Sequence, residues 1–181
     1  MLPPHHRRSL LWKAAFRDGC PEALRELSPI YSALDRRTLA IHEAGHVVIA
    51  QWLGAHFVRA AIWQTGRDLR DGKTWAGNTE TMLLKPNRAH QRMIAVAGSV
   101  AELCWGRQDV SHDFWEDPDQ MSPTDWEMAG CKPGEVNRPL ITAIYKVADL
   151  LHWETGPLWN QLLAVARSLI LLSRGQKMGD Q

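Results

Sequence analysis

The segment TLAIHEAGHVVIAQWLG, residues 38–54, constrains this chain most, because it places ionisable side chains inside an otherwise apolar helical pattern. Within it, His42, Glu43 and His46 form the pattern H-E-x-x-H. Aliphatic residues surround the pattern on most sides of the helix, so we expect the helix to be buried. Two histidines and a glutamate buried together need hydrogen-bond partners or a metal ion, since burying an unpaired polar group is costly.

The spacing of the motif is typical of zinc hydrolases. Side chains four residues apart lie on one helical face, so both imidazoles can reach one zinc ion. Zinc lowers the pKa of a bound water towards ~7, and Glu43 can take the proton of that water as it attacks a carbonyl. Glu43 can then pass the proton to the leaving amine. The alternative interpretation is a core helix with two hydrogen-bonded histidines and no metal.

Gly45 lies inside the motif, although glycine disfavours a helix by about 1 kcal/mol relative to alanine. We therefore expect another element or a substrate to pass close to the helix at this position.

A catalytic zinc usually takes three protein ligands, and the motif supplies only two. His56 lies beyond the expected helix end at Gly54, so it is a poor candidate. The candidate carboxylates downstream are Glu102, Asp109, Asp113, Glu116, Asp117, Asp119 and Asp125. Asp125 follows Ser122 and Pro123 and should lie in the first turn of a helix, where the helix dipole favours a charged carboxylate. The residues alone leave two roles equally open for Asp125: metal ligation, or stabilisation of the helix start.

The fold class expected is mainly α (α+β), with a small β-sheet or hairpin beside the H-E-x-x-H helix. Asp35 is expected to cap that helix at its start, because aspartate is a favoured N-cap residue. The other expected elements are strands 57–64 and 73–82, a helix from Pro86 to Gly106, a helix starting at Ser122 and Pro123, and helices 140–153 and 156–174, the last capped by Thr155.

Composition excludes some classes of function. The net charge of +1 gives no global field that would attract nucleic acid. Cys20, Cys104 and Cys131 are widely spaced and odd in number, which indicates free thiols in a reducing compartment. No signal peptide and no apolar run of ~18 residues is present. We therefore expect a cytoplasmic protein without a membrane span and without a nucleic-acid partner.

Three blocks of the sequence carry a resemblance to a known family. They are TLAIHEAGHVVIAQWLG (38–54), AVAGSVAELCWGR (95–107) and MSPTDWEMAG (121–130). In this order they resemble the motif helix, the "GGRAAEE…G" helix and the "SGASNDIERAT" segment of the FtsH-type ATP-dependent zinc metallopeptidases. The resemblance covers residues 36–131 well and the two closing helices more loosely.

The resemblance implies a zinc metalloendopeptidase acting on a peptide or an unfolded protein. It assigns the zinc ion (Zn²⁺) to His42, His46 and Asp125, and the general base to Glu43. Glu102 matches an acid of the family's second block, and it is expected to accept a hydrogen bond from the free N–H of a ligand imidazole. An equally good interpretation makes Glu102 a buried acid paired with an arginine.

Several positions depart from the family pattern. Ser99 and Leu103 replace an arginine and a glutamate in the second block, and Pro123 and Trp126 are departures in the third. None of these removes an expected ligand or the general base. No P-loop is present, so we expect ATP-independent action, with a separate ATPase or a homo-oligomer as possible partners.

The expected organisation is a helical N-terminal arm at 1–34, a zinc peptidase domain similar to the FtsH-type peptidases at 35–175, and a flexible tail at 176–181. Strand 57–64 is either an edge strand beside the metal, where an extended substrate can add, or part of a plain core hairpin. The tryptophans Trp63, Trp75 and Trp115 either line a substrate groove or pack in the core.

Two other functions remain open from the sequence. One is a catalytically silent zinc-holding domain that binds unfolded segments or a partner protein. The other is a regulatory peptidase with one specific, repressor-like substrate.

Overall fold

The computed structural model describes residues 21–66, 74–108, 110, 115 and 117–174. These residues form a mainly helical structure with one two-stranded antiparallel sheet, which confirms the expected fold class. The elements in chain order are α2 (Pro21–Trp52), β1 (Ala55–Gln64), β2 (Trp75–Leu83), α3 (Arg88–Trp105), the 3-10 turn η2 (Pro118–Gln120), α4 (Pro123–Ala129), α5 (Arg138–Leu151) and α6 (Trp159–Ser173).

Most of the expected N-terminal arm (1–34) and the whole expected tail (176–181) lie outside the described residues. No described helix combines the length and the apolar character needed to cross a lipid bilayer.

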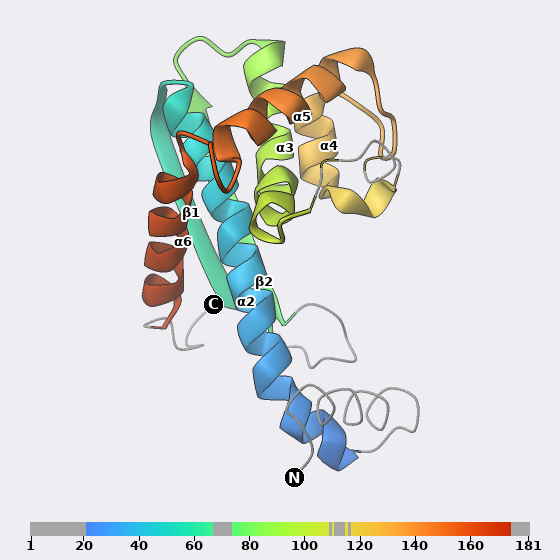
Figure 1. Cartoon of the computed structure of the whole chain (residues 1–181), viewed down its shortest axis with the longest axis vertical. Coiled ribbons are helices and arrows are strands. Elements are labelled where there is room, and N and C mark those ends of the chain that lie inside the picture. The colour runs from blue at the N-terminus through green and yellow to red at the C-terminus, as the bar shows by residue number, and fades with distance from the viewer. Residues whose placement is uncertain (1–20, 67–73, 109, 111–114, 116, 175–181) are drawn as a thin grey trace.

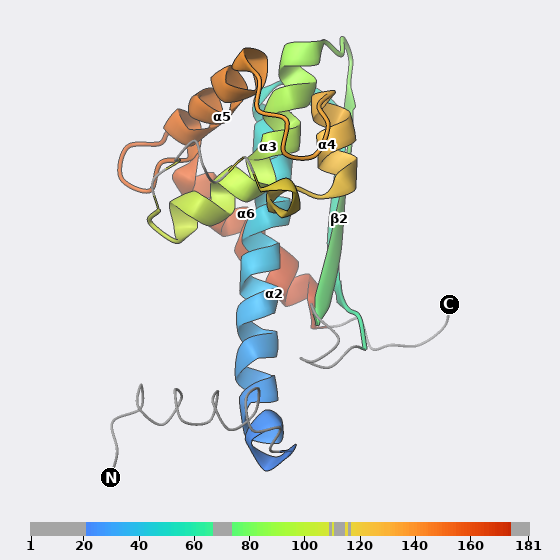
Figure 2. The same ribbon diagram turned by 90° about the vertical axis from the view of Figure 1, so that its right-hand side faces the viewer.

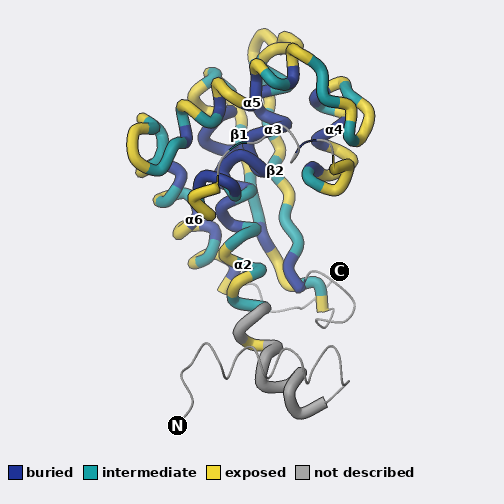
Figure 3. The backbone as a smooth tube through the Cα atoms, turned by 45° about the vertical axis from the view of Figure 1, so that its right-hand side comes forward, coloured by how far each residue is buried: buried dark blue, intermediate teal, exposed yellow. Residues whose placement is uncertain are grey.

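Helix α2 runs along the long axis of the molecule, with α6 on one side and α3 and α4 on the other (Figure 1). Its first turns project beyond the other described elements, as the perpendicular view shows (Figure 2). Its second half is enclosed, and residues 43–50 are all buried. Buried residues gather where this half of α2 packs on α3, and where α3 in turn packs on α5 (Figure 3). The H-E-x-x-H motif therefore lies in the core-facing half of a long helix.

The expected cap at Asp35 is wrong. Helix α2 begins at Pro21 and is continuous across residues 34 and 35, so Asp35 lies inside it. The Asp35 carboxylate instead accepts hydrogen bonds from the backbone N–H groups of Thr74 and Trp75, with N···O distances of 2.6 and 3.0 Å. The Asp35 carboxylate was expected to accept hydrogen bonds from N–H groups of its own helix, but it accepts them from the backbone at the start of β2 instead.

Close packing of α2 on α3 depends on small residues. A Cβ at Gly45 would lie 2.4 Å from the carbonyl oxygen of Ala97 and 2.8 Å from the Cβ of Ala101. The element expected to pass close to Gly45 is therefore α3. Helix α3 starts at the N-cap Asn87 and ends at Gly106.

The sheet is a hairpin of the two expected strands, and it contacts α2 through both of them. In its register, Ile62 of β1 lies opposite Gly77 of β2, and Ala60 lies opposite Thr79. Ile62 is buried, whereas Phe57 and Trp63 on β1 are exposed, so one face of the sheet packs inward and the other faces solvent.

The closing helices are both present, but the expected cap at Thr155 is wrong. Helix α6 begins at Trp159, and its N-cap residue Leu158 makes no side-chain cap hydrogen bond. The Thr155 hydroxyl lies 3.1 Å from Nδ1 of His152, within the turn that precedes the helix. That turn is closed by backbone hydrogen bonds, including one from the Leu158 N–H to the Leu150 carbonyl, which delay the start of α6.

Candidate metal centre

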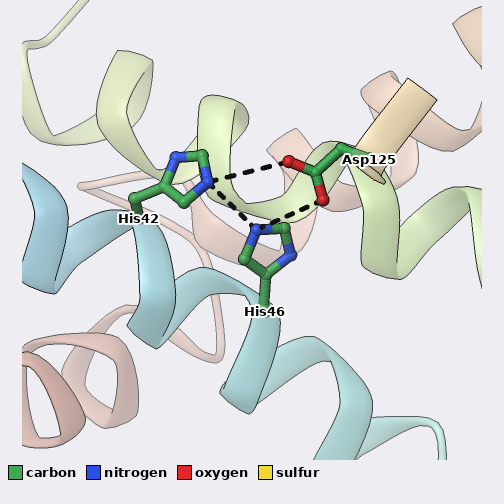
Figure 4. Close-up of side chains that lie close together, drawn as sticks. All are labelled: His42, His46 and Asp125. Carbon is green, nitrogen blue, oxygen red and sulfur yellow. Dashed lines mark hydrogen bonds and ion pairs between the residues drawn. The ribbon is translucent and has the colours of Figure 1, made fainter. Parts of the chain in front are cut away.

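The structure brings His42 and His46 of α2 together with Asp125 of α4 (Figure 4). The two Nε2 atoms lie 3.1 Å apart. An Asp125 oxygen lies 3.9 Å from Nε2 of His42, and the other lies 3.8 Å from Nε2 of His46. The three side chains point toward one another, and their potential ligand atoms all lie within 4.8 Å of each other. They are therefore close enough to hold one metal ion.

Helix α3 holds both imidazoles from their far sides. Nδ1 of His46 donates to the carbonyl oxygen of Ile94 at 2.7 Å. Nδ1 of His42 donates to Oε1 of Glu102 at 2.6 Å, which is the contact expected for Glu102. When Nδ1 of a neutral imidazole donates, Nε2 carries the lone pair. Two lone pairs 3.1 Å apart repel each other unless a cation, either a proton or a metal ion, lies between them, so this arrangement suits a cation.

The pKa values of the two histidines differ in direction. Burial lowers the pKa of His46 to about 4, so this imidazole stays neutral near pH 7, which is its metal-binding form. Burial also acts to lower the pKa of His42, but the hydrogen bond and negative charge of Glu102 outweigh it and raise this pKa above its usual value. Without a metal, the pair therefore takes up its first proton at His42.

Local structure at the start of α4 orients Asp125. The Ser122 hydroxyl caps the helix by accepting a hydrogen bond from the Asp125 backbone N–H at 3.1 Å. The same hydroxyl donates to Oδ2 of Asp125 at 2.7 Å. The next residue, Trp126, is buried and donates from its ring N–H to the carbonyl oxygen of Pro118. Asp125 itself is only 7% exposed, so its carboxylate faces the two histidines and not solvent.

Glu43 lies buried next to the cluster, against strand β2. Its Oε2 accepts a hydrogen bond from the Thr79 hydroxyl at 2.5 Å. Burial raises the pKa of Glu43 above its usual value, although the Thr79 hydrogen bond acts in the opposite direction. A carboxylate with a raised pKa in such a place is a better proton acceptor than an exposed one.

Glycines make room for two of the site's side chains. A Cβ at Gly98 of α3 would lie 2.4 Å from Nε2 of His42, and a Cβ at Gly77 of β2 would lie 2.5 Å from Oε1 of Glu43. Sequence reasoning did not assign Gly98, Gly77 or Thr79 to the site. Two features of the sequence could have indicated the glycines: Gly98 lies within a run of small residues in α3, and Gly77 interrupts strand β2.

A cleft of about 1100 Å³ opens over the cluster, between α2, β2 and the segment that leads into α4. Trp63 and Trp75 line it, whereas Trp115 is buried in the core. The strand that lies against Glu43 is β2, and the contacts of Asp35 with Thr74 and Trp75 hold the start of β2 on α2. An edge-strand role beside the metal is one of the two interpretations of strand 57–64 (β1), whereas β2 provides the contact with Glu43.

The other candidate ligands do not join the cluster. His56 is exposed on β1. Asp117 and Asp119 are exposed at η2, where the Asp117 side chain caps the turn. Asp109, Asp113 and Glu116 lie outside the described residues.

Comparison of the chain with models of known protein families finds no match, and no curated protein matches it either. The similarity to FtsH-type peptidases therefore stays a prediction from the three sequence blocks.

Proposed function

We propose that this chain is a zinc-dependent metalloendopeptidase related to the FtsH-type peptidases, and that it hydrolyses peptide bonds with water as the nucleophile. The observation that carries the proposal is the cluster of His42, His46 and Asp125 at the base of a cleft, with the Glu43 carboxylate buried beside it. The three sequence blocks support the relationship to this family.

The donor set fits zinc. Two imidazole nitrogens and one carboxylate oxygen are common zinc ligands, and three protein ligands leave one position open, as in catalytic sites. Tetrahedral ligands at about 2.0–2.1 Å from a metal lie roughly 3.3 Å from each other. The separations of 3.1, 3.8 and 3.9 Å in the cluster are close to this value. Bound there, zinc supplies a Lewis acid that polarises a carbonyl and lowers the pKa of water towards ~7.

Glu43 carries out the proton transfers in this proposal. It takes a proton from the water whose oxygen bonds to the carbonyl carbon of the substrate. It then delivers that proton to the amide nitrogen as the C–N bond breaks, so the products are a carboxylic acid, which keeps the second hydrogen of the water, and an amine. Thr79 holds Oε2 of Glu43, and no described residue donates a hydrogen bond to Oε1. Oε1 is therefore the oxygen that accepts and releases the proton.

Strand β2 offers a binding mode for the substrate. Among the residues that the structure describes, it pairs with β1 along one edge and with no strand along the other, and its residues Ala76, Gly77 and Asn78 line the cleft. An extended peptide can add to the other edge by main-chain hydrogen bonds, which would lay its backbone past Glu43. Such recognition depends on an extended backbone and favours unfolded segments over folded proteins.

The proposal is tested by assaying cleavage of casein, as an unfolded protein, by the zinc-loaded chain with and without ATP. We expect cleavage that ATP does not alter, because the sequence contains no P-loop. Glu43→Gln should lower the rate about 10²–10⁴-fold while zinc binding persists. Cleavage by this variant at the parent rate would overturn the mechanism.

Two outcomes of the same assay would favour the other functions. Stoichiometric zinc and tight peptide binding without hydrolysis would favour a catalytically silent zinc-holding domain. Cleavage of one particular protein but not of casein would favour a regulatory peptidase.

A further inference from the structure

The Glu43 carboxylate has one side-chain donor among the described residues, the hydroxyl of Thr79. The Oγ1···Oε2 distance is 2.5 Å, which is typical of a short hydrogen bond to a charged acceptor. Thr79 lies 36 residues away on β2, so the contact joins two separate elements. Glu43 is only 5% exposed, which limits the ability of solvent to substitute for the hydroxyl.

Gly77 completes the surface on which this carboxylate lies. Residues two apart on a strand face the same side, so Gly77 and Thr79 both face Glu43. A Cβ at position 77 would lie 2.5 Å from Oε1, 2.8 Å from Cγ and 2.9 Å from Cδ of Glu43. A side chain there would push the carboxylate off the strand. Strand β2 thus holds the Glu43 carboxylate in one position. The Thr79 hydroxyl donates to Oε2, and Gly77, which has no side chain, lies beside Oε1.

A second set of contacts fixes β2 on α2 independently of Glu43. Oδ2 of Asp35 accepts from the Thr74 and Trp75 backbone N–H groups, and the Trp75 ring N–H donates to the Ser32 hydroxyl. From Asp35 to Glu43 the helix rises about 12 Å. From Trp75 to Thr79 the strand advances about 13 Å. The two lengths match, so the Asp35 contacts place Thr79 opposite Glu43 whether or not their hydrogen bond forms.

We propose that Thr79, with Gly77, is a positioning residue for Glu43. The hydroxyl holds Oε2 against β2 and thereby leaves Oε1, beside Gly77, as the oxygen that takes up and releases the proton. This inference rests on the proposed function for its catalytic consequence, whereas the orientation of Glu43 can be measured without any activity.

The variants that test it are Thr79→Val, Thr79→Ser and Thr81→Val. Valine has nearly the shape of threonine but no hydroxyl, and serine keeps the hydroxyl. Thr81 belongs to the same strand and lies opposite Val58, so Thr81→Val makes the same chemical change away from Glu43. Gly77→Ala is a second route to the same displacement, which leaves the Thr79 hydroxyl in place.

We expect crystal structures of the metal-free Thr79→Val and Gly77→Ala chains to show the Glu43 carboxylate displaced from β2, and Thr79→Ser to retain it. In peptide cleavage, Thr79→Val should lower kcat about 10–100-fold with KM and zinc affinity unchanged, and Gly77→Ala should lower kcat to a similar extent. Thr79→Ser should restore most of kcat, and Thr81→Val should match the parent.

A Thr79→Val structure with Glu43 in its parent position would overturn the inference, and so would an unchanged kcat. Equal losses of kcat and zinc affinity would also overturn it, because they would indicate a general structural role. If the parent chain cleaves nothing, the proposed function fails, but the crystal structures still decide whether Thr79 positions Glu43. If Thr79→Val does not fold, Thr79→Ala, which also removes the hydroxyl, is judged by the same two outcomes.

Discussion

His42 and His46 belong to a helix of 32 residues, whereas Asp125 belongs to α4, a helix of seven. The histidines lie in the enclosed half of α2, and partners on α3 hold both rings. Asp125 is oriented mainly by its own helix cap, Ser122, and by the buried neighbour Trp126. Contacts with another helix of the core thus position the ligands on α2, which we call the core-built side. Contacts within a few residues of the chain position the ligand on α4, which we call the locally built side. A bound metal should therefore matter more to the order of α4 than to that of α2.

Metal removal should have the largest effect on stability and should separate the two sides. At a free zinc concentration 1,000 times Kd, a ligand that binds only the folded state stabilises it by about 4 kcal/mol, and chelation removes this contribution. Hydrogen exchange should then speed up in α4 (Pro123–Ala129) but change little in residues 40–50 of α2. Equal acceleration on both sides would contradict the comparison.

Gly45→Val should have the next largest effect on stability, because it disturbs the packing of α2 on α3, on the core-built side. The added side chain meets the Ala97 carbonyl of α3 at a distance that no real Cβ contact shows, so the helices must move apart. We expect a loss of about 1–3 kcal/mol in the free energy of unfolding by urea, even without metal. A variant as stable as the parent would show that α2 and α3 do not pack this closely.

Ser122→Ala should have a smaller effect, because it removes one cap on the locally built side. Loss of an N-cap hydroxyl costs about 1 kcal/mol. Since Ser122 also holds Oδ2 of Asp125, zinc affinity should fall about 10–100-fold, as measured by competition with a chromogenic chelator. Ser168→Ala on α6 is the matched control, because Ser168 is exposed and bonds only within its helix. Equal zinc affinity in both variants would refute a role for Ser122.

Glu102→Gln should have the smallest effect on stability, within about 0.5 kcal/mol, because the amide oxygen can still accept from Nδ1 of His42. The variant removes only the negative charge behind the ring, which lowers the basicity of the ligand nitrogen. Zinc affinity should fall about 10-fold, and titration of the metal-free chain with zinc measures it. A loss of stability comparable to that of Gly45→Val would mean that Glu102 belongs to the core and not to the metal centre.

The sequence predicted the α2 side of the site more fully than the α4 side. The spacing of His42 and His46 determines their common face, since one helical turn relates them. Asp125 lies some eighty residues further on, and no local rule relates such a position to the motif. The residues alone left its role open, and only the similarity to a known family selected it.

Contacts that form only in the folded chain explain the two wrong cap predictions and the site residues that were not predicted. Asp35 is a favoured N-cap residue, but the backbone of β2 satisfies its carboxylate within the helix. Thr79 and Gly77 reach Glu43 only because those contacts fix β2 along α2, and that register cannot be derived from either segment alone. Thr155 precedes a helix whose start is set by backbone hydrogen bonds of the turn before it.

The most direct test of the central claim is a crystal structure of the chain grown with one equivalent of zinc. We predict one zinc ion held by Nε2 of His42, Nε2 of His46 and one oxygen of Asp125, each at about 2.0–2.2 Å, with Glu43 nearby but not bound to the metal. A zinc ion held by the two histidines with Asp125 turned away, or no zinc at this cluster, would contradict the account.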